Sequence, residues 1–94
     1  MPKIIISERL IKLMNKNKCE YSVRGNNIEE CLRFLCEEQS EFEEHLFYPN
    51  KILKSHFLIS LNDTVSSLDA KVLNDDVIEL LIATSGGIEK KNQY

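Results

Sequence analysis

The pattern of apolar and polar residues predicts β-strands in the first quarter of the chain and again near its C-terminal end. Residues 3–7 hold three consecutive isoleucines beside charged residues, and their β-branched side chains favour a pleated, buried backbone over a short helix. Residues 19–23 alternate apolar and polar positions with a period of two, the pattern of a half-buried strand. Residues 77–83 form the clearest predicted strand. The first two segments predict an opening hairpin, and the third predicts a long closing strand.

A single main helix is predicted between residues 28 and 39. Its apolar residues recur at helical spacing and form one stripe, made of Ile28, Cys31, Leu32, Leu35 and Cys36. Asn27 comes directly before the stripe, and Glu30 stands three residues after Asn27, a spacing typical of a helix N-cap. One face of this helix is therefore suited to packing on a sheet. Residues 8–15 show a weaker helical spacing and predict a turn or a short helix.

The pattern between the main helix and the closing strand is weaker. Apolar residues within 42–47 indicate a short amphipathic turn. Residues 56–61 have the composition of a strand, residues 62–63 supply turn chemistry, and residues 64–66 predict a short returning strand. Residues 74–76, Asn-Asp-Asp, predict a second turn before the closing strand.

These elements together predict an α+β domain with the order ββαββ. A mixed sheet of four to five strands with one main helix packed across it is expected, because the helix offers a single apolar stripe. The closing strand is apolar on both faces apart from Glu79, which places it in the centre of the sheet beside the first strand. Ile78, Leu80 and Ile82 are expected to share the core face. Leu81 is then expected to be exposed on the open side of the sheet.

Length and charge narrow the function classes. Ninety-four residues suffice for one domain with one core, and they are too few for a substrate domain plus a cofactor domain. The formal net charge of −3 argues against nucleic acid as a partner, because phosphate backbones need a cationic surface. The longest apolar runs are too short to cross a membrane, and a signal peptide's apolar region is not found, so we expect a cytoplasmic protein without membrane contact.

Cysteines and histidines give no sign of a catalytic or metal site. Cys19, Cys31 and Cys36 do not match a zinc or redox spacing, so reduced, structural thiols are expected. His45 and His56 stand apart, with no cysteine and carboxylate residues at ligand spacing. We therefore expect no catalytic residue, no bound metal and no bound cofactor.

Four short stretches give the chain a resemblance to a known family. They are residues 61–65 (LNDTV), 68–69 (LD), 73–78 (LNDDVI) and 85–87 (SGG). In these stretches the chain resembles the sulfur-carrier proteins of molybdopterin and thiamine synthesis and their relatives in cysteine and homocysteine formation. It departs from the family in two places. Asn74 and Asp75 stand where members often have glycine, although both residue types tolerate a left-handed backbone, and the Gly86-Gly87 pair is followed by residues 88–94.

The resemblance implies a ubiquitin-like β-grasp fold over residues 1–87 and a C-terminal extension, residues 88–94, that a JAMM-type metalloprotease removes. Gly87, with Gly86 before it, would then be the attachment site. An E1-like adenylating enzyme would activate Gly87 with ATP, and the product would be a thiocarboxylate that donates sulfur to a biosynthetic enzyme making a cofactor or a sulfur amino acid. Thr84 and Ser85 would extend the tail. Val65 and Leu81 would contact the activating enzyme.

Other interpretations remain open at this stage. The glycine pair could simply end the last strand, and Val65 or Leu81 could belong to a core covered on both sides of the sheet. The chain could also be a ubiquitin-like modifier joined through Gly87 to lysines of other proteins. A third hypothesis is a non-covalent β-grasp interaction module whose tail is never cut.

Overall fold

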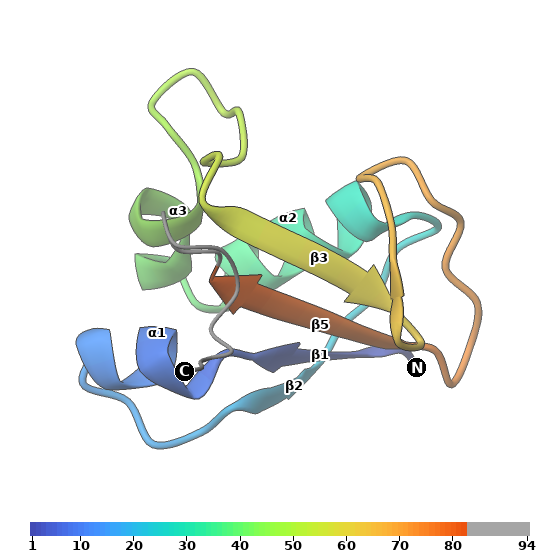
Figure 1. Ribbon diagram of the computed structural model, residues 1–94, viewed down its shortest axis with the longest axis horizontal. Helices are drawn as coiled ribbons and strands as arrows, with labels where there is room; N and C mark the ends of the chain where they lie inside the picture. The colour runs from blue at the N-terminus through green and yellow to red at the C-terminus, as the bar shows by residue number, and fades with distance from the viewer. Residues whose placement is uncertain (83–94) are drawn as a thin grey trace, which may run out of the picture.

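A computed structural model of the chain describes residues 1–82 (Figure 1). Within these residues it contains five strands and three helices. In chain order they are β1 (Lys3–Ile6), α1 (Glu8–Leu13), β2 (Glu20–Ser22), α2 (Ile28–Glu38), α3 (Glu41–Leu46), β3 (Phe57–Leu61), β4 (Thr64–Val65) and β5 (Val77–Ile82). The predicted order of hairpin, helix and later strands is confirmed, and the two weak helical patterns form the short helices α1 and α3.

The strands form one mixed sheet in the order β2-β1-β5-β3-β4. β5 lies in the centre and runs parallel to β1, with Ile4 opposite Ile78. It runs antiparallel to β3, with Ile59 opposite Leu80. The predicted place of the closing strand beside the first is therefore confirmed. An internal strand that pairs on both sides is held firmly, because each of its neighbours supplies a ladder of hydrogen bonds.

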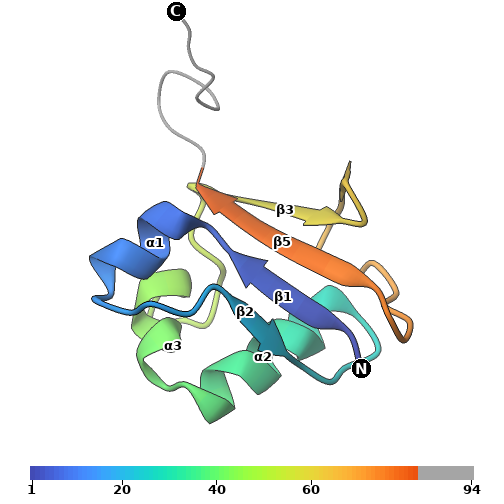
Figure 2. The same cartoon turned by 90° about the horizontal axis from the view of Figure 1, so that it is seen from below.

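The core lies between the sheet and α2. Figure 2 shows α2 and α3 on the same side of the sheet. Residues on the core face of β1 and β5 are fully enclosed, as are those in the stripe of α2; they include Ile4, Ile78, Leu80, Ile28, Cys31 and Leu32. β1 and β5 alternate buried and less buried positions along this stretch. Neither α2 nor α3 therefore lies on the opposite face of the sheet.

The start of α2 follows the predicted capping pattern. The side chain of Asn27 accepts a hydrogen bond of 2.8 Å from the backbone N–H of Glu30, and the Glu30 carboxylate accepts one of 2.8 Å from the N–H of Asn26. Gly25 lies directly against this turn. A Cβ atom at Gly25 would come within 2.7 Å of the Cys31 backbone nitrogen, so glycine is required by the close approach.

The Asn-Asp turns that flank β4 and β5 adopt the left-handed backbone expected of them. Asn62 and Asp63 have φ values of 50° and 72° between β3 and β4, and Asp75 has a φ of 71° before β5. Asn62 also ties the two turns together, because its side-chain amide donates to Asp76 at 3.0 Å and its oxygen accepts from the N–H of Val77 at 2.9 Å. These hydrogen bonds fix the turn that leads into β5.

Candidate functional site

The end of β5 is the point from which the predicted tail departs. The backbone N–H of Ser7 donates to the carbonyl oxygen of Leu80 at 2.9 Å, and Ile82 pairs with Phe57 at the start of β3. Both neighbours thus fix the strand up to its last residues. The predicted tail and attachment residues Thr84, Ser85, Gly86 and Gly87 lie outside the described residues, so their assignment stays a prediction.

Apolar side chains gather on the open face of the sheet beside this exit point. The strand register places Ile5, Leu58, Val65, Val77 and Leu81 on this face, which we call the open-face patch. These residues come from four strands, because β1, β3, β4 and β5 lie side by side. Val65 is exposed and the other four are partly exposed, and apolar residues gathered in this way on a surface are typical of a protein-binding site.

The structure brings the two predicted contact residues, Val65 and Leu81, onto the same face. Val65 lies opposite Ser60 on the short strand β4 and is 65% exposed. Leu81 is only partly exposed, whereas the sequence pattern predicted an exposed side chain. The difference arises because Leu58 lies directly opposite Leu81 on β3, and facing side chains in an antiparallel pair cover one another.

A charged residue of β5 interrupts the open-face patch, and no sequence motif predicted a role for it. Glu79 lies between Val77 and Leu81 along β5, opposite Ile5 on β1 and Ser60 on β3. The hydroxyl of Ser60 donates a hydrogen bond of 3.1 Å to the Glu79 carboxylate, and Ser60 itself is only 6% exposed. The period-two pattern of β5 already put Glu79 on the open face. Its serine partner is nineteen residues away, which a local pattern does not reveal.

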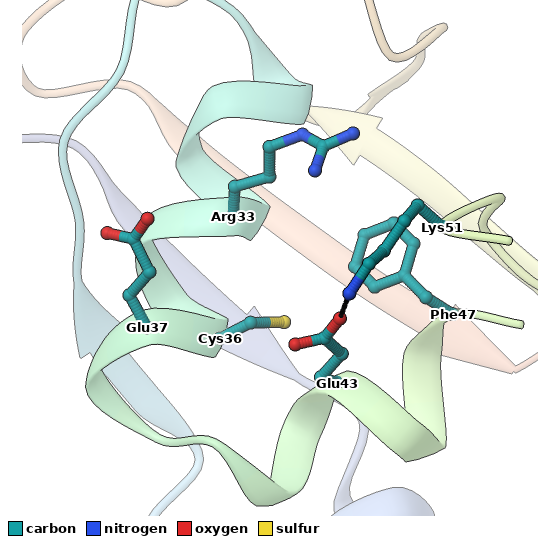
Figure 3. A pocket seen from close by; sticks show the side chains of 6 residues that line it. All are labelled: Arg33, Cys36, Glu37, Glu43, Phe47 and Lys51. Carbon is teal, nitrogen blue, oxygen red and sulfur yellow. Dashed lines mark hydrogen bonds and ion pairs between the residues drawn. The ribbon is translucent and has the colours of Figure 1, made fainter. Parts of the chain in front are cut away.

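A second candidate site is a cavity of about 240 Å³ between α2 and α3 (Figure 3). Six residues line it: Arg33, Cys36, Glu37, Glu43, Phe47 and Lys51. Lys51 forms an ion pair with Glu43. Burial raises the pKa of the Cys36 thiol to about 11, so the thiol is protonated near neutral pH and is a poor nucleophile. The lining residues of the cavity belong to α2, α3 and the segment that follows α3, and Figure 2 shows both helices on one side of the sheet.

The remaining cysteines and the possible metal ligands were also compared with the sequence-based expectation. Cys19, Cys31 and Cys36 are free, and burial also raises the pKa of Cys31 to about 11. Within residues 1–82 no group of three metal-ligating side chains comes together. In the same part of the chain, no helix is long and apolar enough to cross a membrane. Burial thus keeps the Cys31 and Cys36 thiols protonated near neutral pH.

Comparison with solved structures identifies the fold. No protein-family model matches the sequence, and neither does any curated protein. Small archaeal modifier protein 1 from Methanosarcina acetivorans is similar at a TM-score of 0.76 and 19% identity, over 92% of this chain and 95% of that one. Its counterpart from Haloferax volcanii gives a TM-score of 0.74 and 18% identity, over 92% and 98% of the two chains.

A chain in the crystal structure of the BexX/CysO complex of Amycolatopsis orientalis is also similar, with a TM-score of 0.75 and 19% identity, over 93% of this chain and 100% of that chain. These small proteins span nearly the whole described domain. The chain therefore has the ubiquitin-like β-grasp fold that the sequence resemblance implied.

Proposed function

We propose that this chain is the precursor of a sulfur-carrier protein. Residues 88–94 are removed, Gly87 becomes the new C-terminus, and its carboxylate is converted to a thiocarboxylate. The observation that carries the proposal is the position of β5. It is the central strand of a β-grasp sheet, it ends beside an apolar open face, and the sequence continues from it to Gly87 in five residues.

The chemistry requires an activated carboxyl group. A carboxylate is a poor electrophile, so an adenylating enzyme first transfers AMP from ATP to the Gly87 carboxylate, and pyrophosphate leaves. A sulfur nucleophile at the oxidation level of hydrosulfide then attacks the carbonyl carbon, and AMP leaves. Glycine suits this role because it has no Cβ, which lets the backbone pass through a narrow channel. Five extended residues span about 17 Å, enough to reach into an enzyme's active site.

Three enzymes act on the carrier in this proposal: a JAMM-type metalloprotease, an E1-like adenylating enzyme and a sulfur-accepting biosynthetic enzyme. The adenylating enzyme binds the open-face patch through Leu81 and Val65, and it takes up the tail through Thr84 and Ser85. Leu58 extends the same contact, because it lies opposite Leu81. The similar BexX/CysO structure is itself a complex, which supports a partner protein for this kind of fold.

Co-expression tests the proposal. The chain is produced together with the protease and the adenylating enzyme of its own organism, and its intact mass is measured. The expected product ends at Gly87 and has one terminal oxygen replaced by sulfur. A variant carrying Gly86→Ala and Gly87→Ala serves as the control and is expected to keep residues 88–94. Wild-type protein that still ends at Tyr94 with an unmodified carboxylate under these conditions contradicts the proposal.

A second function is a protein modifier joined through Gly87 to lysines of target proteins. The likeness to small archaeal modifier protein 1 supports it. Activation by an adenylating enzyme is common to both functions, and they differ in the acceptor. Higher-mass conjugates that disappear when Gly87 is deleted would select the modifier. A thiocarboxylate without such conjugates would select the sulfur carrier.

A further inference from the structure

The carboxylate of Glu79 occupies the middle of the open-face patch. Its neighbours along β5 are Val77 and Leu81, and its neighbour on β1 is Ile5. Adjacent strands lie about 4.8 Å apart and alternate residues of one strand about 6.6 Å apart, so these three apolar side chains border the carboxylate closely. A partner that covers the patch must therefore cover the carboxylate as well.

Ser60 holds the carboxylate in place. Its hydroxyl donates to one Glu79 oxygen at 3.1 Å, and the serine is buried under its neighbours on the open face. The other carboxylate oxygen takes no hydrogen bond from the side chains of residues 1–82. One oxygen is thus fixed and the second is left to accept a bond from outside the domain.

Glu79 forms no ion pair with the cations of residues 1–82. Four ion pairs form within the described part of the chain, and Glu79 takes part in none of them. Lys3 is the cation on the open face of the neighbouring strand β1, and it pairs with Glu20 of β2 at 2.7 Å. The negative charge of Glu79 is therefore not neutralised by an ion pair inside residues 1–82.

We propose that Glu79 receives an arginine or lysine side chain of the adenylating enzyme, at the centre of an otherwise apolar contact. This inference rests on the function proposed above. Covering an unpaired carboxylate with an apolar surface carries a large desolvation cost. A cation that donates a hydrogen bond to the free oxygen offsets that cost. Glu79 then selects partners with a basic side chain at this point and rejects purely apolar or acidic ones. The alternative is a charge that only keeps the sheet face soluble.

Binding of the adenylating enzyme to four chain variants separates these two roles. Glu79→Lys reverses the charge, Glu79→Gln removes it while keeping an oxygen for the Ser60 hydroxyl, and Glu79→Leu completes the apolar patch. Glu38→Gln is the matched control, because Glu38 is an exposed glutamate on α2, across the sheet from the patch. Dissociation constants are measured by calorimetry at low and high salt, and thermal melting confirms that each variant is folded.

The expected result is a loss of affinity of about tenfold or more for Glu79→Lys and for Glu79→Leu, with Glu38→Gln unchanged. Added salt should weaken binding of the wild type more than binding of Glu79→Gln, since screening acts on the ion pair. The inference is overturned if Glu79→Lys loses less than about tenfold in affinity, or if Glu79→Leu binds more tightly than the wild type. If the wild type is adenylated while the variants bind normally, only this inference fails. If the wild type neither binds nor is adenylated, the proposed function fails with it.

Discussion

Replacing Leu80 and Leu81 separately by alanine tests whether one face of β5 stabilises the core while the other binds the adenylating enzyme. Leu80 is fully buried in the core, whereas Leu81 is partly exposed on the open face. Leucine to alanine removes three carbon atoms, which corresponds to about 2.4 kcal/mol of transfer free energy at about 0.8 kcal/mol per carbon. A cavity inside the core raises the cost of Leu80→Ala to about 3–5 kcal/mol. Leu81→Ala leaves no closed cavity, and half-burial limits its cost to about 1 kcal/mol.

Urea unfolding followed by circular dichroism measures both costs, since the sequence has no tryptophan. For a domain of this size each kcal/mol lowers the melting temperature by about 4–8 °C, so Leu80→Ala should melt at least about 12 °C below the wild type. Affinity for the adenylating enzyme is expected to change in the opposite order. Leu81→Ala weakens binding, and Leu80→Ala retains it at temperatures where the variant is folded. Equal costs in stability, or unchanged affinity of Leu81→Ala, would refute the assignment of the two faces.

Three further predictions concern the backbone and the turns. Gly25→Ala should destabilise the fold by about 1–3 kcal/mol, because the new Cβ meets the Cys31 nitrogen; a melting temperature equal to the wild type's would count against the close approach. Asp75→Gly should stabilise the domain by up to about 1 kcal/mol, since glycine adopts the φ of 71° without strain, and a loss of stability in urea would contradict this. Hydrogen bonds from a backbone N–H and from Asn62 hold the pKa of Asp76 below its ordinary value of 3.8. The stability they confer is fully present above pH 3.8 and is lost as the pH falls through the lower pKa that Asp76 has in the folded state. Asp76→Asn should therefore flatten the acid side of the stability profile, and an unchanged profile would argue against the network.

Strong local periodicity explains why most of the fold could be predicted from the sequence. The stripe of α2 and its Asn27 cap are local features, and both occur where the pattern places them. The central position of β5 followed from a strand that is apolar on both faces. The short helices α1 and α3 were harder to predict, because six residues give too few turns for a clear period.

The site could be predicted only in part, because its key contacts join residues far apart in sequence. The partial covering of Leu81 depends on Leu58 opposite it, and the carboxylate of Glu79 is held by a hydrogen bond from Ser60. Neither pairing is visible until the register of β3 against β5 is known. Val65 is exposed on the predicted face. The roles assigned to the tail residues up to Gly87 are based on the sequence resemblance alone.

The most direct test of the central claim is the intact mass of the protein isolated from its native host. The account predicts a chain that ends at Gly87, with residues 88–94 gone and a sulfur atom in place of one oxygen of the terminal carboxylate. A chain that still ends at Tyr94 with every oxygen in place, in cells actively making sulfur-containing metabolites, would contradict it.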